Sequence, residues 1–91
     1  MVGRNIRYIR ELRGYKQEYV AEEAGICQST LSRIEDGQRR PHYDTVVRIT
    51  RVLRCSHEHL TRPYRNRAEL IAHVLRDFPD GPEDTSIGKG G

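Results

Sequence analysis

The sequence predicts an all-α protein, a compact bundle of five helices followed by one additional C-terminal helix. Apolar residues recur at intervals of three and four over most of the first 78 residues, which is the period of amphipathic helices. Glycines follow three of these stretches directly, where a left-handed residue commonly ends a helix. No stretch shows the strict alternation typical of a half-buried strand. The chain has 91 residues, enough for one small domain with a short appendage.

The first three helices are predicted over residues 4–13, 16–24 and 28–36. Gly14, Gly25 and Gly37 follow them and mark their ends. The inward faces are apolar residues at helical spacing: Ile6, Ile9 and Leu12 in the first helix, Val20, Ala21 and Ala24 in the second, and Leu31 and Ile34 in the third.

The second half of the chain contains three further helices by the same criteria. One spans residues 43–53, and a short one begins after the N-cap residue Ser56 and ends near Leu60. The last runs over 63–78, with Pro63 at its first position. The segment after it is rich in glycine, proline and acids, so we expect it to be disordered. The chain therefore divides into a helical domain over 1–62, a helix over 63–78 and a tail over 79–91.

Composition excludes several classes of protein. No apolar run approaches the roughly 20 residues that cross a bilayer, and the N-terminus lacks the apolar region of a secretory signal, so we expect a soluble, cytoplasmic protein. Cys27 and Cys55 occur in apolar contexts and are expected to be reduced and buried. His57 and His59 are expected on the surface. We expect no metal, no cofactor and no enzymatic activity, because no catalytic arrangement of side chains stands out.

The positive charge is concentrated in one part of the chain. The net charge is +3, but residues 1–67 carry 14 Lys and Arg against 8 Asp and Glu, whereas residues 68–91 carry 2 against 5. A basic domain of this kind is typical of proteins that bind a polyanion. The basic part contains the second and third helices.

The third helix carries a polar stripe opposite its apolar face. At 100° per residue, Gln28, Ser29, Ser32 and Arg33 lie on one side, with Thr30 at its edge. Glutamine can pair with adenine, arginine with guanine, and hydroxyl groups with several bases in the DNA major groove, which admits one α-helix. The stripe therefore predicts a helix that reads the edges of base pairs.

Contacts with the phosphate backbone are expected on both sides of this helix. The free N–H groups at the start of the second helix favour an anion, and Gln17 there can donate its side-chain amide. Arg39 and Arg40, in the loop after the third helix, can reach adjacent phosphates or the minor groove.

Residues 17–41, QEYVAEEAGICQSTLSRIEDGQRRP, resemble the Cro/CI-type helix-turn-helix of the XRE family, and the resemblance extends over about residues 4–60. It implies a lambda-repressor-like bundle of five helices that binds DNA as a repressor or activator, often as a dimer. It also implies a phosphate contact for Gln17 and base-reading positions at Gln28, Ser29 and Arg33, with Thr30 and Ser32 beside them.

The resemblance further implies a structural pair between Arg10 in the first helix and Glu35 at the end of the third. Three residues depart from the family pattern, and one of them is Ala24, which replaces a larger apolar residue. Cys27 stands where a Ser or Thr usually caps the third helix, and a thiol caps poorly. Asp36 replaces the common Asn, and because a carboxylate repels phosphate we expect no DNA contact from it.

The C-terminal helix carries an apolar seam with the spacing of a heptad repeat, formed by Tyr64, Ala68, Ile71, Leu75 and Phe78. Leu70 and Val74 widen it. The five-helix bundle is complete by Leu60, so this face needs another partner. It could fold back on its own domain or form a dimer interface with a second subunit, and we favour the dimer. Two third helices would then lie about 34 Å apart on DNA.

These observations predict a sequence-specific transcriptional regulator, a repressor rather than an enzyme, that binds a double-stranded DNA operator as a homodimer. The alternative is an antitoxin or protein-interaction adaptor that uses the C-terminal helix to bind a partner protein. No membrane association is expected.

Overall fold

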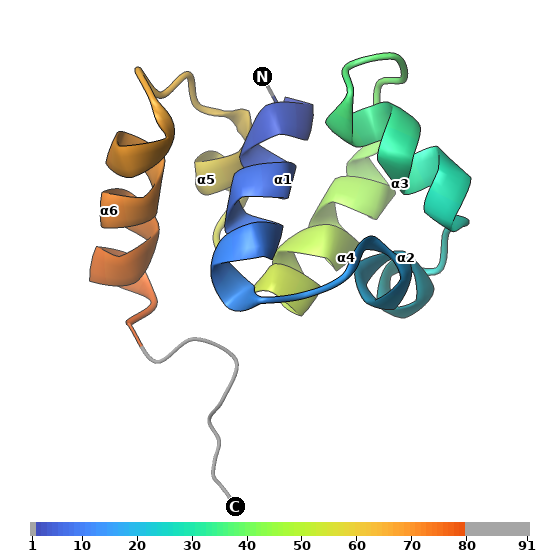
Figure 1. The fold of residues 1–91 in the computed structure, drawn as a ribbon, viewed down its shortest axis with the longest axis horizontal. Coiled ribbons are helices and arrows are strands. Elements are labelled where there is room, and N and C mark those ends of the chain that lie inside the picture. The colour runs from blue at the N-terminus through green and yellow to red at the C-terminus, as the bar shows by residue number, and fades with distance from the viewer. Residues whose placement is uncertain (1, 80–91) are drawn as a thin grey trace, which may run out of the picture.

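The computed structural model describes residues 2–79, which form six α-helices and contain no strand (Figure 1). The helices are α1 (Val2–Arg13), α2 (Gln17–Ala24), α3 (Gln28–Glu35), α4 (Tyr43–Leu53), α5 (His57–Thr61) and α6 (Arg67–Asp77). The all-α bundle expected from the sequence is confirmed. Within the described residues no helix combines the length and the apolar character needed to cross a membrane.

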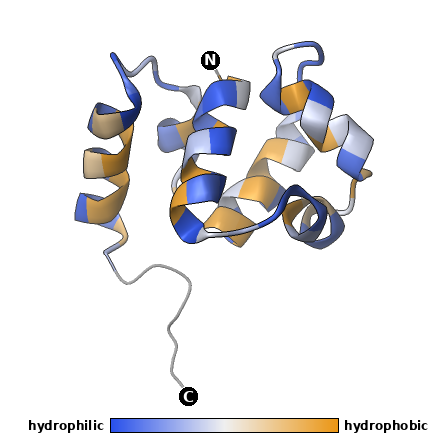
Figure 2. Cartoon of the chain, in the orientation of Figure 1, coloured by the Kyte–Doolittle hydropathy of each residue, from blue (hydrophilic) through white to orange (hydrophobic). Residues whose placement is uncertain are grey.

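The core is built around α1, which contacts α3, α4, α5 and α6. Figure 2 shows apolar residues on the sides of the helices that face one another. Ile6 and Ile9 of α1 are fully buried, as are Leu31 of α3 and Ile49 of α4. At about 25 cal/mol per Å² of apolar surface, such burial is the dominant stabilising term in a domain of this size.

The turn between α2 and α3 follows from Gly25. Its φ of 74° lies in the left-handed region, which glycine adopts without steric cost. The backbone N–H groups of Gly25 and Ile26 then bond back to the last turn of α2, and the chain reverses toward α3. The position of this glycine therefore sets the angle between the two helices.

Gly3 allows a close approach between α1 and α3. A Cβ atom at this position would lie 1.9 Å from the carbonyl oxygen of Ile34 and 3.0 Å from that of Glu35. Only a residue without a side chain fits there. The first turn of α1 thus packs directly on the backbone at the end of α3.

Two helices begin two or more residues away from the predicted start, and the other boundaries differ by at most one residue. α1 begins at Val2 rather than residue 4. α6 begins at Arg67 rather than Pro63, because Asn66 is its N-cap and its side chain accepts the N–H of Glu69 at 2.9 Å. Residues 63–66 therefore form a connection. Of the tail predicted over 79–91, residues 80–91 lie outside the described part of the chain.

The last helix folds back on its own domain. Leu70 and Val74 are fully buried, and Tyr64 is 7% exposed, with α6 packed on α1 and α5. Arg67 pairs with Glu11 of α1 and lies over the ring of Tyr8. Tyr64 is therefore part of the core of its own protomer, and its expected place in an intersubunit seam is wrong. Ala68, Leu75 and Phe78 are exposed, and Ile71 is half-buried.

A buried histidine links α5 to α6, contrary to the surface position expected for it. His59 is 3% exposed; its Nδ1 accepts the backbone N–H of Ser56, and its Nε2 lies 2.9 Å from Asp77 Oδ2. Ser56 in turn accepts the N–H of His59, which completes a capping box. Hydrogen bonds from Arg76 and His59 lower the pKa of the Asp77 carboxyl.

The two cysteines differ in environment, and neither forms a disulfide. Cys55 is buried, and burial raises the pKa of its thiol to about 12, so it remains protonated at neutral pH. Cys27 is exposed, which corrects the expectation that both thiols are buried. Its position directly before α3 places it at the surface of the turn.

Candidate nucleic-acid interface

The outer side of α3 is polar and accessible. Gln28, Ser29 and Arg33 are exposed, while Thr30 and Ser32 are half-buried. On the opposite side Leu31 and Ile34 are at most 1% exposed. The structure thus brings together on one surface the five residues of α3 that the sequence singled out. Neither the three hydroxyl groups nor the guanidinium of Arg33 has a hydrogen-bond partner within residues 2–79.

The start of α3 has no side-chain cap. Cys27 occupies the N-cap position with extended backbone angles, and its thiol makes no capping hydrogen bond. The helix is instead fixed from its other end and its inner face. This agrees with the poor capping ability expected of a thiol.

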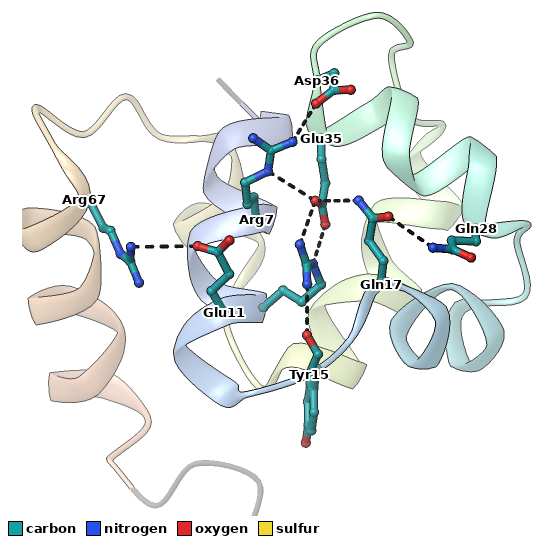
Figure 3. A network of polar contacts seen from close by, with 9 residues as sticks. Arg7, Glu11, Tyr15, Gln17, Gln28, Glu35, Asp36 and Arg67 are labelled. Atoms are coloured by element: carbon teal, nitrogen blue, oxygen red, sulfur yellow. Dashed lines mark hydrogen bonds and ion pairs between the residues drawn. The ribbon is translucent and has the colours of Figure 1, made fainter.

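Glu35, the last residue of α3, is held by a buried network of polar contacts (Figure 3). Its side chain is fully buried. Arg10 donates to it twice, from Nε at 2.7 Å and from Nη2 at 3.1 Å, and also donates to the carbonyl of Tyr15. The pair implied by the family resemblance is therefore present. It ties the end of α3 to α1 and to the loop before α2.

Arg7 joins the same network and was not anticipated from the sequence. Its Nε lies 3.4 Å from Glu35 Oε1, and its Nη2 donates to Asp36 Oδ1. Hydrogen bonds to Asp36 and Glu35 raise the pKa of the Arg7 guanidinium, which stays charged. Because Arg7 precedes Arg10 by three residues, both lie on one face of α1, and this spacing is the signal that could have revealed it.

Gln17 connects the network to the exposed surface. Its Nε2 donates to Glu35 Oε1 at 3.0 Å, and its Oε1 accepts from Gln28 Nε2 at 3.5 Å (Figure 3). One amide hydrogen of Gln17 is therefore directed inward, and its oxygen is directed toward α3. The buried carboxylate thus fixes the orientation of two glutamines at the edge of the polar surface.

Four cations on or beside this surface have no acidic partner in the described part of the chain: Arg33 on α3 itself, and Lys16, Arg39 and Arg40 beside it. Lys16 is the N-cap residue of α2 and was not singled out from the sequence. A lysine at the positive end of a helix dipole is locally unfavourable, and this placement is the signal that could have revealed it. Asp36 is the acid of the adjacent C-cap position, and Arg7 neutralises it.

Comparison with known proteins identifies the fold. Residues 6–60 match the helix-turn-helix family. The chain belongs to this family. The match covers α2, the turn at Gly25 and α3, which are the two helices and the turn of the motif, and it confirms the XRE-type resemblance.

Two bacterial relatives are similar over most of their length. The HTH-type transcriptional regulator YazB of Bacillus subtilis is 41% identical over 61 residues, covering 67% of this chain and 88% of YazB. The HTH-type transcriptional regulator y4dJ of Sinorhizobium fredii is 35% identical over 63 residues, covering 69% of this chain and 82% of that protein. No solved structure matches the chain.

This helix-turn-helix protein is a DNA-binding transcription regulator by family. Its polar helix α3 is the second helix of the motif, which in such proteins enters the major groove. Within residues 2–79 no group of three or more His, Cys, Asp or Glu side chains could hold a metal ion. The exposed side chains of α3 and the cations beside it offer hydrogen-bond donors, acceptors and positive charge.

Proposed function

We propose that this protein represses transcription by binding a specific operator with α3 in the major groove. The observation that carries the proposal is the division of α3 into two sides. Its inner side is locked to α1 by buried apolar residues and by Glu35, whereas its outer side presents polar groups to solvent. A rigid helix with free donors and acceptors loses little entropy when it enters a groove.

Base recognition is assigned to the exposed polar groups of α3. Arg33 can donate two hydrogen bonds to N7 and O6 of guanine. Gln28 donates one amide hydrogen to Gln17, which leaves its second amide hydrogen and its oxygen for N7 and N6 of adenine. The hydroxyl groups of Ser29, Thr30 and Ser32 supply further contacts with bases or with nearby phosphates.

Contacts with the DNA backbone are assigned to the flanks of α3. Arg39 and Arg40 are exposed in the loop that follows it, and Lys16 is exposed at the N-terminus of α2. Gln17 retains one amide hydrogen for a phosphate at that helix end. These contacts orient the protein without reading sequence, and their strength depends on salt.

Binding to the operator represses transcription because other proteins can no longer reach the occupied DNA. A homodimer on two half-sites adds the affinity of two helices and gives the operator a two-fold symmetry.

Replacing Arg33 by alanine is expected to cost about 1–3 kcal/mol of binding and to relax the preference at one base pair. Arg39→Ala is the matched control, because it removes a cation of the same surface that does not read bases. It should weaken all DNA sequences alike and reduce the slope of log K against log salt by about 0.9.

The measurement is fluorescence anisotropy on a sequence enriched from a random DNA pool and on unrelated DNA of equal length. If the ratio of the affinity for the enriched DNA to the affinity for unrelated DNA is the same for Arg33→Ala and the parent protein, the role of α3 is contradicted. If Arg39→Ala lost as much specificity as Arg33→Ala, the assignment of base reading to Arg33 and of backbone contact to Arg39 would be wrong.

A further inference from the structure

We infer that the cavity between the C-terminal ends of α4 and α6 binds a small organic anion, with a carboxylate, sulfonate or phosphate group on an apolar body. The inference goes beyond the proposed operator binding and does not depend on it, because none of the described residues that line the cavity belongs to α2 or α3. It follows from the size of the cavity, from two cationic side chains beside it and from the backbone conformation of one of them.

The cavity lies where α4 and α6 end. In Figure 1 these two helices end on the same side of the molecule, and Phe78 and Pro79, which follow α6, complete the wall of the cavity. Its volume is about 460 Å³. Sites for small molecules have volumes of about 300–1,000 Å³. The cavity is therefore large enough for a substituted aromatic or aliphatic acid.

Part of the cavity wall is apolar. The ring of Phe78 is held by an edge-to-face contact with His59, with ring centroids 5.9 Å apart, and Phe78 remains 38% exposed. Cys55 is buried beside it, and burial raises the pKa of the thiol to about 12, so this side chain is neutral. An apolar body can pack on these two side chains, which favours an organic anion over an inorganic one.

Arg51 and Arg54 supply positive charge at the cavity. Both are exposed, and within the described part of the chain neither guanidinium has a hydrogen-bond or ion-pair partner. Asp77 is the acid among the described lining residues, and both of its carboxylate oxygens are engaged. Oδ2 lies 2.9 Å from His59 Nε2, and Oδ1 accepts from Arg76 Nε at 3.2 Å. Arg76 thus balances the acid, and two arginines remain for an anion.

The backbone of Arg54 is left-handed, with φ of 55° and ψ of 61°, at the C-cap of α4. The other left-handed residues in the described part of the chain are all glycines, which adopt this conformation without steric cost: Gly14, Gly25 and Gly37. A side chain at such a position costs free energy. A cation at a helix end favours the helix dipole, but Arg51 in the last turn already supplies one. An arginine in place of a glycine therefore indicates a role for its side chain at the cavity.

The conformation at Arg54 is held by contacts that do not involve its side chain. Arg13 of α1 donates from Nη2 to the carbonyl of Arg54 at 2.7 Å and from Nε to the carbonyl of Leu53 at 2.9 Å. The N–H of Cys55 bonds to the carbonyl of Thr50. Glycine at position 54 can keep all of these contacts. The guanidinium can therefore be removed while the frame of the cavity stays in place.

The site is tested by titrating the full chain with anilinonaphthalene sulfonate, a fluorescent sulfonate on an apolar body. Phenylnaphthylamine, the same body without the sulfonate, is the neutral counterpart. We expect Arg54→Gly to bind the sulfonate at least about tenfold more weakly than the parent, because a charged donor group is lost. The urea midpoint of Arg54→Gly should equal or exceed that of the parent, since glycine suits the left-handed backbone.

Arg65→Ala is the matched control. Arg65 is exposed like Arg54, but it precedes α6, whereas the cavity lies at the other end of this helix. This variant should bind the sulfonate as the parent does. The inference is overturned if Arg65→Ala loses as much affinity as Arg54→Gly, if Arg54→Gly loses none, or if the parent binds the neutral compound as tightly as the sulfonate.

The position of the bound sulfonate is read from backbone amide chemical shifts of the parent. Changes concentrated at residues 50–55 and 77–78 would support the inference. Changes concentrated on α3, or displacement of the sulfonate by unrelated duplex DNA, would assign the anion to the DNA-binding surface and overturn it.

Carboxylates of the chain itself are a second source of the same chemistry, because Asp80, Glu83 and Asp84 follow Pro79 in the sequence. The combined variant Asp80→Asn, Glu83→Gln and Asp84→Asn separates the two sources. Unchanged affinity for the sulfonate supports a separate ligand. Tighter binding that Arg54→Gly reverses would show that these carboxylates compete for the cavity, and would overturn the inference of a separate ligand.

Discussion

Glu35→Gln is expected to lower the free energy of unfolding by about 3–5 kcal/mol, because it removes one charge from a buried pair and leaves the other without its partner. The Glu35 side chain is fully buried and that of Arg10 is 13% exposed, so water cannot replace the lost contact. The neutral amide also presents donor hydrogens where Arg10 and Gln17 already donate. A domain of this size is stable by only about 5–13 kcal/mol, so the loss is a large fraction.

The measurement for Glu35→Gln is urea unfolding followed by circular dichroism. The matched control is Asp36→Asn, which removes the neighbouring carboxylate from its contact with Arg7. Both side chains of that pair are about 40% exposed, so this change should cost no more than about 1 kcal/mol. Equal, small losses in the two variants would show that the buried network does not fix the end of α3.

Gly3→Ala is expected to destabilise the protein by about 3 kcal/mol or more, although alanine is the better helix former. The added methyl group would overlap the carbonyl oxygen of Ile34, a backbone atom that cannot rotate away. The first turn of α1 and the end of α3 must therefore separate, which also loosens Arg7 and Arg10 around Glu35. The expected result is a lower urea midpoint together with weaker DNA binding.

Gly37→Ala is the control for this substitution. Nothing lies within 4 Å of a Cβ atom at Gly37, so its cost comes only from the left-handed backbone, with a φ of 78°. That cost is about 1–2 kcal/mol. If Gly3→Ala were as stable as the parent, or Gly37→Ala were the more damaged variant, the close approach of α1 and α3 would be wrong.

The sequence was most informative where structure is determined locally. Gly25 and the apolar spacing around it predict α2, the turn and α3, because a left-handed residue and a period of 3.6 act over a few residues. The outward position of Arg33 and Gln28 follows from the same period, since Leu31 and Ile34 must face the core. The Arg10–Glu35 pair, by contrast, was reached through the family resemblance.

Contacts between distant segments could not be predicted in this way. The approach of Gly3 to Ile34 depends on how α1 crosses α3, which no local pattern encodes. His59 was placed on the surface because its partner Asp77 is 18 residues away on α6. The apolar seam predicted over 63–78 included Tyr64, but Tyr64 lies in the connection before α6, which begins at Arg67, and its side chain is buried in the core.

The central claim, that α3 reads base edges in the major groove, is tested most directly by methylation interference on DNA enriched by the parent protein. Dimethyl sulfate modifies guanine at N7 in the major groove and adenine at N3 in the minor groove. We predict that guanine N7 methylation within each half-site blocks binding, and that Arg33→Ala becomes insensitive at one of these positions. Interference confined to adenine N3, or the same pattern for the parent and Arg33→Ala, would contradict the claim.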